Sequence, residues 1–200
     1  MKRIVQIFLL PLLVLPLNSF ATSLLPLDIS SLHQQSQDIL VAESVSNSTK
    51  KETASGLIVT YSSFKVLNTL KGAAVQTYTI KQIGGKLPGD SGGLKVPGVP
   101  TFTVGERYVL FVPPASKTGF ASPVGLMQGK FDITSDANTN TAMVSNGRDF
   151  GVLTQSLPSG TMPASVRNTI QTLPAASSAN LAKRTKIPLH EFELLIRSLK

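Results

Sequence analysis

The candidate chemistry of this sequence begins with Ser91, which stands in the segment Gly-Asp-Ser-Gly-Gly at residues 89–93. A serine becomes a nucleophile when a neighbouring base takes its proton and an acid orients that base. The chain has two histidines, His33 and His190, and neither stands in a motif typical of a catalytic base. A lysine base would have to be desolvated, for which a glycine-rich loop is a poor place. The sequence therefore favours a loop with local backbone hydrogen bonds, and a secreted serine hydrolase using Ser91 stays the alternative.

The five letters around Ser91 also resemble the nucleophile segment of trypsin-like serine proteases. In that family the histidine typically follows Ala-Ala and precedes a cysteine, whereas His33 lies between Leu32 and Gln34. Only about 70 residues of a processed chain precede Ser91, too few for the barrel and a half that the family places there. The residues that follow, Leu-Lys-Val-Pro, also depart from the family pattern. We interpret the match as coincidental.

Metal and cofactor chemistry finds few ligands in this chain. There are no cysteines, which excludes thiolate sites and thiol catalysis, and the two histidines are far apart. Asp132, Asp136 and Asn138 resemble a loose calcium loop but lack the EF-hand spacing and its terminal glutamate, so a plain turn is expected. Gly84-Gly85 precedes no helical pattern and predicts no phosphate loop. We expect no cofactor and no metal.

The strongest candidate for recognition is the segment 84–104, called the Gly/Pro loop below. Glycine and proline dominate it, which predicts a long loop, and long loops on a rigid scaffold are typical places for recognition. A loop that only packs over an open end of the fold is the alternative. The candidate contact residues in and beside the loop are Lys86, Asp90, Ser91, Lys95, Phe102 and Arg107.

Strand patterns lie on both sides of this loop. Alternating or continuous apolar runs predict strands at about 39–45, 57–68, 75–83, 107–112, 123–134 and 141–144. A slip of phase in the second run predicts a β-bulge at Ser62-Ser63, and Gly125 and Gly129 predict a bend inside a strand. The expected fold is mainly β: a small antiparallel barrel of five or six strands, similar to an oligonucleotide/oligosaccharide-binding (OB) barrel. A sandwich is the alternative topology.

The two ends of the chain have a different character. Lys2 and Arg3 precede an apolar run at 4–17, and Ser-Phe-Ala at 19–21 fits a peptidase site, so residues 1–21 are predicted to be a signal peptide. An uncleaved anchor is the alternative. The expected organisation is then a loosely held lead-in at 22–37, the barrel at 38–150, a Pro/Ser/Ala-rich linker at 151–186 and an amphipathic helix at 187–200. One short helix is expected within the linker, at 163–172. We expect this helix to dock on the barrel, with a free tail as the alternative.

Charge limits the partners. Lys and Arg number 19 against 11 Asp and Glu, but the basic residues are scattered, whereas nucleic-acid binders concentrate charge on one element. We therefore expect no nucleic acid as a partner and no membrane span after signal cleavage. An unknown protein or an anionic envelope polymer is the expected partner. The signal sequence predicts a periplasmic or extracellular location, and the absence of cysteine favours a bacterial source.

A second resemblance rests on Leu-Lys-Gly at 70–72 and on GERYVLF and GLMQGKF further along. These segments resemble a group of uncharacterised bacterial exported proteins built on a small β-barrel, and more loosely the netrin-like and metalloprotease-inhibitor barrels. The inhibitors use an N-terminal cysteine that this chain lacks, so their activity is not implied. The resemblance implies export, a barrel and no catalytic residue. The function we expect is a non-enzymatic exported binding or accessory module, acting at the cell envelope or outside the cell. A protein-assembly role of the terminal helix is a further alternative.

Overall fold

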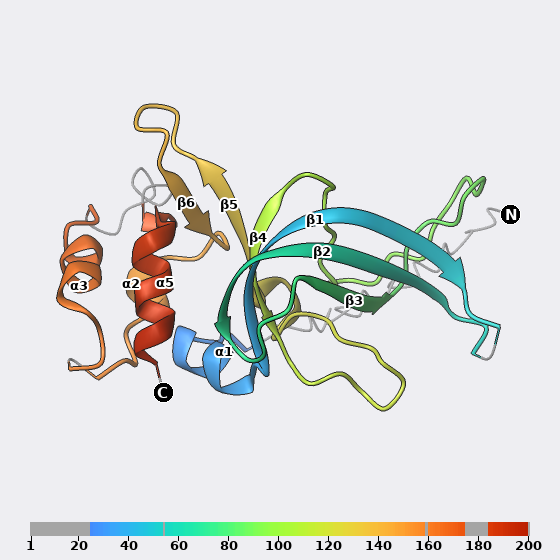
Figure 1. Cartoon of the computed structure of the whole chain (residues 1–200), viewed down its shortest axis with the longest axis horizontal. Helices are drawn as coiled ribbons and strands as arrows, with labels where there is room; N and C mark the ends of the chain where they lie inside the picture. The colour runs from blue at the N-terminus through green and yellow to red at the C-terminus, as the bar shows by residue number, and fades with distance from the viewer. Residues whose placement is uncertain (1–24, 54, 159, 175–183, 200) are drawn as a thin grey trace, which may run out of the picture.

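The computed structural model describes residues 25–53, 55–158, 160–174 and 184–199, which form one seven-stranded antiparallel sheet in the order β3-β2-β1-β4-β5-β6-β7 (Figure 1). The strands are β1 (Asp38–Lys51), β2 (Ile58–Lys71), β3 (Thr77–Ile83), β4 (Arg107–Val112), β5 (Lys130–Ser135), β6 (Ala142–Ser145) and β7 (Ile187–Pro188). The helices are α1 (Ile29–Gln35), the 3-10 helix η1 (Leu126–Gly129), α2 (Phe150–Leu153), α3 (Ala164–Gln171) and α5 (Leu189–Ser198). The mainly β fold is confirmed. The expected five- or six-stranded barrel is not confirmed, because the sheet has seven strands and is not closed, with β3 and β7 at its edges.

The sheet is strongly curved because its two longest strands contain β-bulges. The pairing of β1 with β2 slips at three places, which leaves Val45 in β1 and Leu67 and Leu70 in β2 without a directly opposite residue. Bulges of this kind bend a strand and increase its twist. The bulge predicted at Ser62-Ser63 lies instead on the opposite strand, because an extra residue on either strand can absorb the same slip. As a result β1 and β2 arch away from the helices (Figure 1).

The central strand β4 is buried on both faces, as its unbroken apolar sequence predicts. Val109 and Phe111 point into a cluster on the helix side of the sheet, which we call the helical core. Tyr108, Leu110 and Val112 point into a smaller cluster on the opposite, concave side, which we call the concave core. The neighbouring strand β1 divides its side chains between the two clusters in the same way. The sheet therefore separates two cores that share its central strands.

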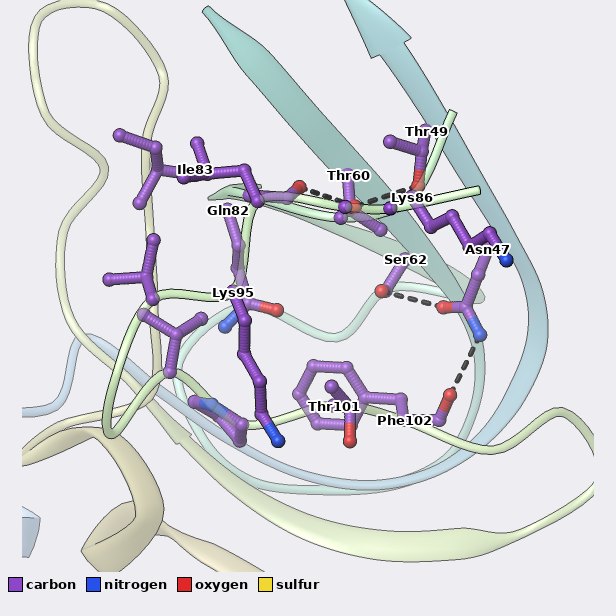
Figure 2. A pocket seen from close by; sticks show the side chains of 18 of the residues that line it. Asn47, Thr49, Thr60, Ser62, Gln82, Ile83, Lys86, Lys95, Thr101 and Phe102 are labelled. Atoms are coloured by element: carbon purple, nitrogen blue, oxygen red, sulfur yellow. Dashed lines mark hydrogen bonds between the residues drawn. The ribbon is translucent and has the colours of Figure 1, made fainter. Parts of the chain in front are cut away.

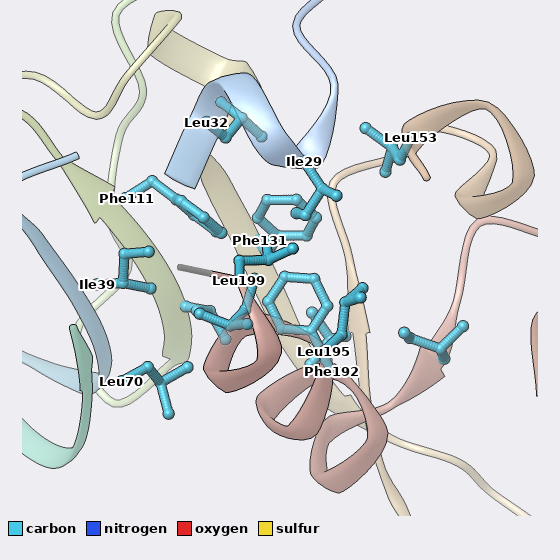
Figure 3. Close-up of a cluster of buried hydrophobic side chains, with 14 of the residues drawn as sticks. Ile29, Leu32, Ile39, Leu70, Phe111, Phe131, Leu153, Phe192, Leu195 and Leu199 are labelled. Atoms are coloured by element: carbon cyan, nitrogen blue, oxygen red, sulfur yellow. The ribbon is translucent and has the colours of Figure 1, made fainter. Parts of the chain in front are cut away.

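The helical core is built around four phenylalanine rings, of which Figure 3 labels Phe111, Phe131 and Phe192. Phe131 lies 4.9 Å from Phe192 and 5.5 Å from Phe111 between ring centroids, and Phe150 lies 5.9 Å from Phe192. Phe192 belongs to α5, and both it and Leu195 are fully buried. The C-terminal helix thus docks on the sheet, as expected, and its apolar face is not free to bind a partner.

Two segments hold more structure than the sequence predicts. Residues 29–35 of the expected lead-in form α1, which the Asp28 carboxylate caps by accepting a hydrogen bond from Ser31 N at 2.7 Å. Ile29 and Leu32 of this helix are fully buried, so this part of the lead-in is not loosely held. In the expected linker, α3 lies within the short helix expected at 163–172, whereas most of α2 falls where no helix was expected.

The segment around the strand glycines also differs from its prediction. The expected strand at 123–134 begins only at Lys130, because residues 126–129 form η1. Gly129 is needed there for close approach, since an added Cβ would lie 2.5 Å from Val124 O. The predicted signal peptide lies outside the described residues. Among those that are described, no helix combines the length and the hydropathy needed to cross a membrane.

Candidate ligand-binding pocket

A hollow lies on the concave side of the arched strands, where the Gly/Pro loop faces them (Figure 2). Its volume is about 580 Å³, within the range of roughly 300–1,000 Å³ typical of small-molecule sites. The strands contribute five polar side chains, which we call the strand wall: Asn47, Thr49, Thr60, Ser62 and Gln82. The opposite side is built mainly by residues 84–86, 91–96 and 99–102 of the loop.

Two threonines of the strand wall hold the beginning of the Gly/Pro loop. Thr60 Oγ1 donates a hydrogen bond of 2.7 Å to Gly84 O. Because this uses the only hydroxyl hydrogen of Thr60, the Thr49 hydroxyl donates to Thr60 Oγ1 over 2.9 Å. Gly85 presses its backbone against the same pair, since an added Cβ would lie 2.7 Å from Thr49 Oγ1. A glycine is therefore required where the loop leaves β3.

A second pair of polar side chains holds the end of the lining segment. Asn47 Nδ2 donates to Phe102 O at 2.7 Å, and Asn47 Oδ1 accepts from Ser62 Oγ at 2.7 Å. The Phe102 ring forms the floor of the pocket, in edge-to-face contact with Phe64 at 4.9 Å and with Tyr108 at 5.4 Å. The two ends of the pocket's outer side are thus fixed to the strands before any ligand arrives.

The tip of the loop is closed by its own backbone. Gly85 N donates to Leu94 O at 2.8 Å, and Leu94 N donates to Gly85 O at 2.9 Å. Between them, the Asp90 carboxylate accepts a hydrogen bond from Gly92 N at 3.2 Å, and Asp90 N donates to Leu87 O at 3.1 Å. Asp90 therefore shapes the turn that contains Ser91.

The structure brings together four of the six residues that the sequence singled out. Lys86, Ser91, Lys95 and Phe102 all line the pocket. Asp90 is exposed at the loop tip and does not line it. Arg107 does not line it either, because it begins β4 and lies between Glu43 and Ile133 in the sheet.

The strand wall is the part of the site that sequence reasoning missed. Its signal is the run Ser-Val-Ser-Asn-Ser-Thr at 44–49, in which polar residues occupy both faces of a strand. A strand with one face on a core alternates apolar and polar residues instead. Such a run indicates that neither face of this part of β1 contributes to an apolar core.

The charges of the pocket have one sign. Lys86 and Lys95 line it, whereas no aspartate or glutamate does. Neither lysine forms an ion pair with any described residue. Their side chains extend along different sides of the pocket, Lys86 on the side of Asn47 and Lys95 on the side of Thr101 (Figure 2).

Neither histidine lies beside Ser91. His33 belongs to α1 and is 7% exposed, and burial, followed by the positive charge of Lys71, holds its pKa below the ordinary value. His190 is exposed in α5. Both helices lie at the end of the sheet away from the arch (Figure 1), and neither histidine lines the pocket. A serine–histidine pair at Ser91 is therefore not formed.

The described residues contain no group of three His, Asp or Glu side chains that could hold a metal ion. Asp136, the centre of the loose calcium resemblance, accepts hydrogen bonds of 3.0 Å from the backbone N–H groups of Asn138 and Thr139. These bonds to Thr139 and Asn138 lower the pKa of Asp136. The segment is a capped turn.

Comparison with known proteins adds no identity. Neither the models of known protein families nor the curated proteins include one that matches this chain.

Proposed function

We propose that the protein is a non-enzymatic exported binding or accessory module that holds a small ligand, or the end of a larger one, in this pocket. The observation that carries the proposal is the pre-formed lining. Five strand side chains and the backbone of the Gly/Pro loop are fixed by hydrogen bonds on two sides of one hollow. A pre-formed cavity with a few oriented polar groups is the usual form of a binding site.

Binding is favoured over serine hydrolysis by the surroundings of Ser91. Ser91 lies on an exposed loop tip, and both histidines of the chain lie elsewhere in the fold. Export is supported by the signal-type sequence at residues 1–21. The cell envelope or the medium is accordingly where we place the ligand.

The test is to fill the pocket with a side chain. Gly92 lines the pocket, has nothing within 4 Å of an added Cβ and has no positive φ, so Gly92→Trp adds an indole to the pocket lining with little backbone cost. Gly160 also has nothing within 4 Å of an added Cβ and no positive φ, but it lies outside this pocket. Gly160→Trp is therefore the matched control.

Binding is measured by ligand-observed NMR with a panel of sugars, amino acids, carboxylates, organic phosphates and neutral amphiphiles. We expect at least one compound class to bind the wild-type protein and Gly160→Trp but not Gly92→Trp. A binder retained by Gly92→Trp, or a wild-type protein that binds no member of the panel, would count against the pocket as the working site.

A further inference from the structure

The two lysines of the pocket indicate the charge of its occupant. Lys86 and Lys95 line a hollow that no carboxylate lines, and no ion pair with a described residue neutralises them. The nearest acidic residue along the loop, Asp90, is exposed at the tip and is engaged by Gly92 N. A cleft lined by one sign of charge concentrates ligands of the opposite sign.

The same pocket has an apolar side. The residues that give it this character are Ile83, Leu94, Val96, Val99, Pro100 and Phe102. Leu94 is 41% exposed to solvent, and an isoleucine and two valines line the same hollow beside it. An apolar body placed there would remove these side chains from water, which is the main favourable term in most binding.

The strand wall has few hydrogen-bond donors left to offer a ligand. The hydroxyl hydrogens of Thr49, Thr60 and Ser62 are already given to protein acceptors. Asn47 Nδ2 gives one of its two hydrogens to Phe102 O at 2.7 Å, and Gln82 Nε2 gives one of its two to Ser122 Oγ at 3.3 Å. A ligand covered with hydroxyl groups would therefore meet mainly hydrogen-bond acceptors on the strand wall. The lysine ammonium groups are the strongest donors left in the lining.

From this combination we infer that the occupant is a small anionic amphiphile: a molecule with one carboxylate, phosphate or sulfonate group and an apolar ring or chain. The lysines bind the anionic group, and the apolar residues of the loop cover the body. This inference rests on the proposed function, because it assigns the ligand class of the same pocket.

Two probes that differ in a single group test the inference. Anilinonaphthalene sulfonate carries a sulfonate, and phenylnaphthylamine has the same rings without it. The fluorescence of both increases in an apolar site. We expect the sulfonate to bind the wild-type protein about tenfold more tightly than the neutral probe, as one or two nearby unit charges at a partly solvated site provide.

Substitution of the lysines separates charge from shape. In the double variant Lys86→Gln, Lys95→Gln, the affinity for the sulfonate is expected to fall to that for the neutral probe, whose own affinity should not change. Lys117→Gln, an exposed lysine outside the pocket, is the matched control and should leave both affinities unchanged. Displacement of the bound sulfonate probe by decanoate or decyl phosphate, but not by decanol, would identify which natural anionic group is accepted.

The outcomes distinguish the two proposals. If neither probe binds, or if Gly92→Trp binds both as the wild type does, the pocket itself is not the site and the proposed function fails. If both probes bind in the pocket with equal affinity, and the lysine variant changes neither, the pocket stands and the anionic ligand class is refuted.

Discussion

Replacing Gly85 by alanine is expected to release the base of the Gly/Pro loop from the strand wall. Gly85 has a φ of +127°, which L residues rarely adopt, and an added Cβ would overlap the Thr60 hydroxyl. Keeping the loop in place against both effects would cost about 2 to 6 kcal/mol, since backbone strain and overpacking each cost roughly 1–3 kcal/mol.

If keeping the loop in place costs an amount near the upper end of that range, releasing the loop costs less free energy. It gives up the two bonds between Gly85 and Leu94 and the bond from Thr60 to Gly84. At about 1 kcal/mol each, these bonds amount to about 3 kcal/mol. Because the variant takes the less costly arrangement, Gly85→Ala should lose about 2 to 3 kcal/mol of unfolding free energy, mostly with the loop base detached.

Gly89→Ala is the matched control for this prediction. Gly89 also has a positive φ, +78°, but nothing lies within 4 Å of an added Cβ. It should therefore show only the backbone cost of about 1–2 kcal/mol. Urea unfolding followed by circular dichroism gives the free energies, and amide hydrogen exchange at Leu94 reports the bridge. We expect exchange at Leu94 to accelerate in Gly85→Ala and to stay slow in Gly89→Ala. Equal exchange at Leu94 in the two variants would refute the reasoning.

Three further predictions concern other parts of the molecule. Asn47→Ala should cost about 1–3 kcal/mol and weaken probe binding, because it leaves Phe102 O and the Ser62 hydroxyl without their partner; unchanged urea stability and binding would contradict this. Phe192→Ala should lower the free energy of unfolding in urea by about 3–5 kcal/mol, because its ring is fully buried. Leu194 is half-exposed, so Leu194→Ala should change it by no more than about 0.5 kcal/mol. Equal losses in the two variants would show that α5 is not docked as described. Because the pKa of His33 is lowered in the folded state, the folded state binds fewer protons than the unfolded state. The contribution of His33 to stability is therefore complete above its ordinary pKa of 6.5 and is lost as the pH falls through that value towards the folded-state pKa. His33→Gln should therefore flatten the decline in unfolding free energy between about pH 7 and 5, and an unchanged slope would contradict the assignment.

The parts of the fold that could be predicted are those whose signal is local. The run at 109–112 is apolar at every position, so it predicts a strand buried on both faces wherever it lies in the sheet. Segment 84–104 is rich in glycine and proline, so it predicts a loop, and four of the candidate contact residues do line one hollow. The apolar spacing of the last helix likewise predicts the face that docks.

The parts that could not be predicted depend on pairing between distant residues. The hollow exists because β1 and β2 arch, and the arch depends on bulges such as Val45, which appear only when Ser44 is paired with Phe64. The strand-wall residues face the loop as a consequence of that arch. Helix α1 was missed for a different reason, since its seven residues are too few to establish a helical period and its buried face is revealed only by contact with the sheet.

The division of β1 and β4 between two cores has a consequence for how the molecule unfolds. Each of these strands is a wall of the helical core on one side and of the concave core on the other. Loss of the helices would expose one side of the strands that position the pocket, and loss of the pocket side would expose the strands on which the helices pack. Neither core can keep its central wall without the other, because β1 and β4 belong to both. The described chain should therefore unfold as one cooperative unit. A destabilising substitution in the C-terminal helix, far from the pocket, should then lower the fraction of folded protein that is able to bind.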